Sequence, residues 1–136
     1  MQNKCIDLCV YRINSAIETL EAARACMDIK HYKDVINRSY YAAFYAIKAV
    51  LAIEEVDFKR HKDVVAYFNK NYVANERFEK TMGRILATLQ QKREASDYDD
   101  FYVASKEEAE IQYENAEHIV NEVKIFLTNE FNVKLN

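Results

Sequence analysis

Arg93, Asp97 and Tyr98 lie close together in the sequence and have side chains that could bind a phosphate and a base. An arginine guanidinium binds phosphate through paired hydrogen bonds, and a tyrosine ring can stack on a base. A structural explanation is also open, in which Arg93 pairs with Asp97 while Tyr98 plugs one end of the fold. The three residues therefore predict either a ligand site or a clamp.

A second group of basic and aromatic side chains recurs at steps of three and four residues, which places them on one side of a helix. Its members are Arg38, Tyr41, Tyr45 and Lys48. They could extend a nucleic-acid site or form a buried tyrosine stripe capped by Arg38. His61 is either a hydrogen-bonding residue at a helix end or a further member of this site.

Patterns typical of metal or nucleophilic catalysis are missing. A di-iron helical bundle needs Glu-x-x-His pairs, but Asn115 precedes His118 at that spacing and Phe58 precedes His61. With one glycine in the chain, a glycine-rich phosphate loop is excluded. We expect no metal site and no cofactor, and we assign no catalytic residue.

Composition indicates one helical domain. The 136 residues suffice for a single core, include no proline and one glycine, and carry a net charge of −3. Any contact with nucleic acid must then depend on a local basic patch. The sequence contains no run of about 20 uncharged apolar residues and begins without a leader-like segment, so we expect a cytoplasmic protein without membrane contact. Cys5, Cys9 and Cys26 are expected to be reduced, buried thiols.

The elements that must position these side chains form an up-and-down bundle of about five helices. Residues 31–53 are apolar on most sides and predict the central helix, preceded by a helix over 3–27 in an antiparallel hairpin. A third helix is expected over 59–72, with Val65, Phe68 and Tyr72 inward. A fourth is capped by Asn75 and contains Gly83 at a close contact.

The apolar period then breaks between Lys92 and Ala104, which predicts a long functional loop carrying Arg93, Asp97 and Tyr98. Ser105 and Glu108 match a capping box at the start of a fifth helix. Residues 1–136 thus form a single domain.

The string Arg-Ser-Tyr-Tyr-Ala-Ala-Phe-Tyr-Ala at residues 38–46 resembles the central helix of the HEPN domain, a small all-helical module associated with nucleotides and RNA. The resemblance extends to two later segments, which contain His61, Val65 and Phe68, and then Arg93, Asp97 and Tyr98. It implies a homodimer that binds nucleotide or RNA beside a small nucleotidyltransferase, in toxin-antitoxin or related systems. Apolar positions around residues 31–53, beyond one inward stripe, also favour a dimer.

Ribonuclease members of that family carry an arginine and a histidine with four to six residues between them. Here Arg93 is followed by Asp97 and Tyr98, and Asp would repel phosphate while Tyr is a poor proton shuttle at neutral pH. Arg24 and His31 match the spacing by chance. We therefore expect a non-catalytic binding and assembly module, with a metal-independent endoribonuclease toxin as the alternative. A purely structural dimer would instead show a buried Arg93–Asp97 pair and no open groove.

Overall fold

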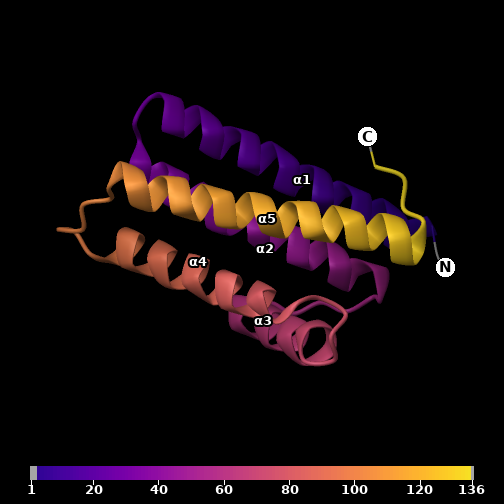
Figure 1. The fold of residues 1–136 in the computed structure, drawn as a ribbon. Helices are drawn as coiled ribbons and strands as arrows, with labels where there is room; N and C mark the ends of the chain where they lie inside the picture. The colour runs from indigo at the N-terminus through magenta and orange to yellow at the C-terminus, as the bar shows by residue number, and fades with distance from the viewer. Residues whose placement is uncertain (1–2, 136) are drawn as a thin grey trace.

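The computed structural model describes residues 3–135 as an up-and-down helical bundle without strands, as predicted (Figure 1). Met1, Gln2 and Asn136, which also fall in the predicted domain, lie outside the described residues. The elements are α1 (Asn3–Asp28), α2 (Tyr32–Ile53), α3 (His61–Phe68), a π-helical turn η1 (Asn69–Val73), α4 (Lys80–Tyr98) and α5 (Lys106–Phe131). Within the described residues, no helix is long and apolar enough to span a membrane.

Helix α2 is the centre of the bundle and packs against α1, α3, α4 and α5. Ala42, Ala46 and Ala49 are fully buried on it, because their methyl groups allow neighbouring helices to approach closely. Figure 1 shows α5 crossing over α2, with α1 on one side and α4 on the other. Since the single chain hides nearly all apolar residues of α2, these residues no longer argue for a dimer.

The antiparallel hairpin of α1 and α2 is confirmed. Lys30 adopts a left-handed backbone conformation in the tight turn, and the His31 amide donates to the Cys26 carbonyl at 2.9 Å. Cys5 and Cys9 are buried and Cys26 is half-buried, and all three are free thiols.

The third predicted helix is shorter than expected, because α3 gives way to η1 after Phe68. Val64 is fully buried where Val65 was expected to point inward, whereas Phe68 and Tyr72 are buried as predicted. The close contact predicted at Gly83 is present: a β-carbon there would lie 3.0 Å from the Asn69 Oδ1 atom. Helix α4 thus crosses η1 closely.

Two predictions about α4 are wrong. Asn75 does not cap it, because Glu76 turns into the left-handed region and the helix begins only after Glu79. The predicted loop at Lys92–Ala104 is mostly helix, since α4 continues to Tyr98. The inward positions of α4 change from leucine to Arg93 and the buried Ser96. The apolar period therefore stops there, although the helix continues.

The capping box predicted at the start of α5 forms only one of its two hydrogen bonds. Ser105 Oγ accepts a hydrogen bond from the Glu108 amide at 3.1 Å. The Glu108 carboxylate accepts from the Tyr102 hydroxyl, where a capping box would direct it to the Ser105 amide.

Candidate nucleotide-binding site

Tyr40 links three helices at the centre of the candidate site. Its ring is buried on α2, and its hydroxyl forms a hydrogen bond with Nδ1 of His61, the first residue of α3, at 2.9 Å. The guanidinium carbon of Arg93, on α4, lies 4.8 Å from the centre of the Tyr40 ring and 5.7 Å from that of Tyr41. Arg93 and His61, far apart in sequence, therefore contact the same tyrosine.

Burial sets the protonation of this cluster. Burial raises the pKa of Tyr40 to about 12, although Arg93 opposes the rise. Burial also lowers the pKa of His61, and the positive charges of Arg93 and Lys48 lower it further. For Arg93, burial alone would lower the pKa, but Tyr41, Tyr40 and Tyr98 outweigh it and the pKa is raised. At neutral pH the cluster contains a phenol, an uncharged imidazole and a guanidinium cation.

Arg93 and Asp97 form the predicted pair, one turn apart on α4. The nearest nitrogen and oxygen are 3.6 Å apart, and Asn37 Nδ2 donates to Asp97 Oδ2 at 3.2 Å. The Arg93 side chain is only 12% exposed, and its Nε atom has no hydrogen-bond partner among the described residues. Tyr98 is 77% exposed, so it does not plug the end of the bundle.

A cleft of about 490 Å³ opens between α1, α2 and the start of α3. Four predicted residues line it together: Tyr41, Tyr45, Lys48 and His61. Phe44 forms its inner wall and stacks on the His61 ring with 4.0 Å between ring centres. Tyr41 separates this cleft from Arg93, because it lines the cleft and also contacts the guanidinium.

Two cations border the cleft, and one of them, Arg12, was missed from the sequence. Arg12 donates to the Lys48 carbonyl at 3.0 Å, and both Arg12 and the Lys48 ammonium lie 3.3 Å from Asp57. Burial alone would raise the pKa of Asp57, but the Phe58 amide, Lys48 and Arg12 outweigh it and lower the pKa. The signal for Arg12 was a polar face shared with Ser15 and Thr19, which also line the cleft.

The remaining predicted residues lie outside the cleft. Arg38 pairs with Asp34 at 3.6 Å, while Asp97 and Tyr98 sit at the C-terminal end of α4. The structure thus brings half of the predicted site residues together in one cleft, and Tyr41 lies between this cleft and Arg93. Because a partly buried Arg93–Asp97 pair and an open cleft coexist, the purely structural alternative fits only in part.

The sequence matches known proteins over most of its length. The model of the HEPN domain matches residues 10–126. A protein of Methanocaldococcus jannaschii named "Putative toxin MJ0605" is 33% identical over 82% of this chain and 83% of its own, and "Putative toxin MJ0142" of the same organism is 28% identical over 85% and 78%. A "UPF0332 protein" of Thermotoga maritima is 27% identical over 82% and 80%. A match of the family model that covers most of the helical bundle, including α2, His61 and Arg93, means that this chain belongs to the HEPN domain family.

Proposed function

We propose that this HEPN domain is a non-catalytic module that binds a nucleotide or single-stranded RNA in the cleft between α1, α2 and α3. The observation that carries the proposal is the meeting of two tyrosine rings, Tyr41 and Tyr45, with the cations Arg12 and Lys48 in one open cleft. Aromatic rings bind bases by stacking, and Lys48, 22% exposed, is the cation that can reach an adjoining phosphate, because Arg12 is only 14% exposed and held by Asp57.

The size of the cleft supports a ligand of that kind. Its volume of about 490 Å³ falls in the range of about 300–1,000 Å³ usual for small-molecule sites. The net charge of −3 provides no long-range attraction to phosphate, so affinity comes from direct contacts. Of the cluster of Arg93, Tyr40 and His61, only His61 lines the cleft, and Tyr40 holds its imidazole in place through a hydrogen bond.

The assembly part of the proposal concerns protein partners. The family resemblance supports a homodimer and a nucleotidyltransferase partner, and the names of the two Methanocaldococcus jannaschii relatives support a place in a toxin-antitoxin system. Exposed apolar side chains occur near the α4–α5 connection at Tyr98, Phe101 and Val103. Light scattering at micromolar concentration tests the dimer, and a monomer would remove this part of the proposal.

Metal-independent RNA cleavage is the second candidate, favoured by one observation. An uncharged imidazole, His61, and a guanidinium, Arg93, contact the same tyrosine, and this pairing of a base with a phosphate-binding cation suits cleavage through the 2′-hydroxyl. Against it, His61 Nδ1 is engaged by Tyr40, and Arg93 is mostly buried and paired with Asp97. We therefore rank binding first.

Fluorescence anisotropy with a labelled single-stranded RNA oligonucleotide tests the binding site. Tyr45→Ala should weaken binding roughly tenfold, because stacking contributes about 1–3 kcal/mol per base. Lys48→Ala should also weaken binding, because it removes a phosphate contact. Arg84→Ala, an exposed cation on α4, is the matched control and should bind like the parent. Tyr98→Ala tests the alternative site that the sequence predicted at the end of α4. A roughly tenfold loss of affinity in Tyr98→Ala, with the affinity of Tyr45→Ala unchanged, would move the site there.

A gel assay of the same RNA without metal tests the second candidate. The parent should cleave no faster than the Arg93→Ala and His61→Ala variants. Cleavage that both substitutions abolish, in variants that remain folded, would make the ribonuclease the better description.

A further inference from the structure

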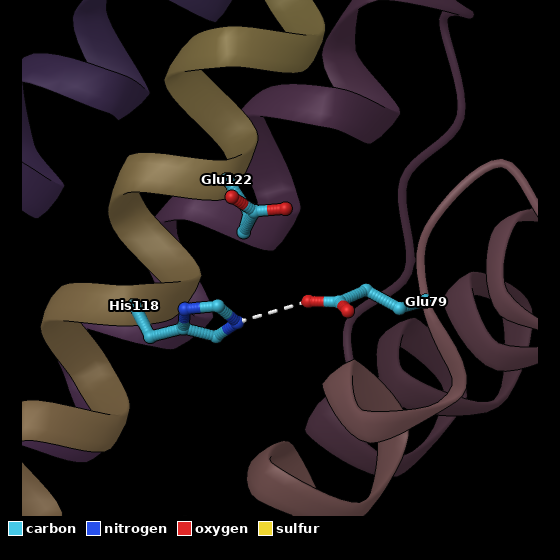
Figure 2. Close-up of side chains that lie close together, drawn as sticks. All are labelled: Glu79, His118 and Glu122. Carbon is cyan, nitrogen blue, oxygen red and sulfur yellow. Dashed lines mark hydrogen bonds and ion pairs between the residues drawn. The ribbon is translucent and has the colours of Figure 1, made fainter.

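Three side chains with metal-ligating atoms converge between α5 and the segment that precedes α4. His118 and Glu122 stand on successive turns of α5, and Glu79 reaches toward them from the residue before α4 (Figure 2). The His118 Nε2 atom is 3.2 Å from Glu79 Oε1, and one ligand atom from each of the three residues lies within 4.8 Å of the others. One imidazole nitrogen and two carboxylate oxygens can therefore reach a common point.

The surroundings are acidic. Glu79 and Glu122 also line a cleft of about 480 Å³, together with Glu76 and Glu130. Arg77 is the cation among its described lining residues, and its guanidinium is already engaged: it lies 3.5 Å from Glu54 and 4.7 Å from the centre of the Tyr72 ring. The excess of carboxylates favours a bound cation at this point.

We propose that Glu79, His118 and Glu122 bind a divalent transition-metal ion of the Zn²⁺ class, with water completing the coordination. A nitrogen ligand selects Zn²⁺, Co²⁺ or Ni²⁺ over Mg²⁺ and Ca²⁺, which prefer oxygen ligands throughout. The His118 Nε2 atom and the Glu79 carboxylate are already in contact, and binding replaces their hydrogen bond with coordination of the ion, with the His118 proton on Nδ1. Because the ligands come from two segments, the ion ties the start of α4 to α5.

Isothermal titration calorimetry of the full chain with ZnCl₂, joined to thermal melts, tests this site. One equivalent should bind, and a hundredfold excess over the dissociation constant should raise the melting temperature by roughly 5–10 °C. His118→Ala, Glu79→Gln and Glu122→Gln should each weaken binding at least tenfold. MgCl₂ at the same concentration should neither compete nor stabilise.

Matched substitutions separate this site from ordinary surface binding. His31 is an exposed histidine that pairs with one carboxylate, Asp34, at 3.6 Å, and Glu110 is a glutamate elsewhere on α5. His31→Ala and Glu110→Gln should bind Zn²⁺ like the parent. Co²⁺ absorption adds an independent reading, because a thiolate charge-transfer band would assign binding to a cysteine. That band, or equal affinity of the parent and His118→Ala, would overturn the proposal.

Discussion

The cleft beside His61 and the cleft beside Glu79 have nearly the same volume, about 490 and 480 Å³, but different chemistry. The first combines tyrosine rings with Arg12, Lys48 and Glu18, and both of its cations pair with Asp57, while the second is lined by four glutamates and Arg77. The net charge of −3 therefore averages over one cleft that is nearly balanced in charge and one that is acidic. The histidines differ as well: His61 is stacked on Phe44 and bonded to a buried phenol, whereas His118 is 41% exposed beside a carboxylate.

The largest expected difference between the two regions is in stability. Tyr40→Ala should lower the free energy of unfolding by about 3–5 kcal/mol, because it empties a fully buried site. Tyr40→Phe should cost about 1–3 kcal/mol, since it leaves the His61 nitrogen without its partner. His118→Ala, in the acidic region, should change stability by no more than about 0.5 kcal/mol. Urea unfolding measures all three, and equal losses for Tyr40→Ala and His118→Ala would erase the distinction.

The second difference is in pH dependence. The pKa of His61 is lowered by burial and by Arg93 and Lys48, so the folded state binds its proton less readily than the unfolded state, where the value is near 6.5. This contribution to stability is complete above pH 6.5 and is lost as the pH falls from there toward the lowered pKa. Thermal melts from pH 8 to pH 5 should show a loss that His61→Asn reduces. An unchanged profile in His61→Asn would show that His61 does not titrate in this way.

A third, smaller effect concerns salt. For a single-stranded RNA, Lys48→Gln should reduce the slope of log affinity against log salt by at most about 0.7, because one phosphate contact is lost and Asp57 already neutralises part of that charge. Glu122→Gln, in the acidic cleft, should leave the slope unchanged. Arg93→Ala should also leave the slope unchanged, because Arg93 is mostly buried and paired with Asp97. A slope altered by Arg93→Ala alone would place the phosphate at α4.

The smallest effect is expected at Gly83, one turn after Glu79 on α4. Alanine gains up to about 1 kcal/mol in helix propensity, but its β-carbon would lie 3.0 Å from Asn69 Oδ1. Because this oxygen ends a side chain that can shift, Gly83→Ala should change the free energy of unfolding by less than about 1 kcal/mol. Ala87→Gly, at an exposed position of α4, measures the effect of helix propensity alone and should lower the free energy of unfolding by about 1 kcal/mol. A loss above about 2 kcal/mol in Gly83→Ala would show that Asn69 is fixed.

The helices were predictable from sequence wherever their inward face is apolar. The centre of the bundle, α2, follows from the spacing of its apolar residues, and α1 and α5 follow in the same way. The end of α4 was mistaken for a loop because Arg93 and Ser96 occupy inward positions there. A polar residue on the inward face of a helix looks, in the sequence, like a solvent-exposed residue.

Helical spacing predicted the residues of the candidate sites that share one helix, whereas His61 on α3 was named through the family resemblance. Tyr41, Tyr45 and Lys48 recur at helical steps, so their common face could be read directly. Arg12 joins them only through the packing of α1 on α2. Likewise, His118 and Glu122 share a face of α5, but Glu79 is brought to them by the fold. Sequence spacing carries no information about such meetings between distant segments.

The buried alanines of α2 let neighbouring helices approach closely but offer no polar contact that fixes their position along the axis. The hydrogen bond between Tyr40 and His61 and the contact of Arg93 with the Tyr40 ring are directional contacts that do. Buried polar groups of this kind can fix register in helical assemblies, even where they add little net stability. In this bundle Tyr40 thus fixes the positions of α3 and α4 along α2, and thereby the shape of the cleft beside His61.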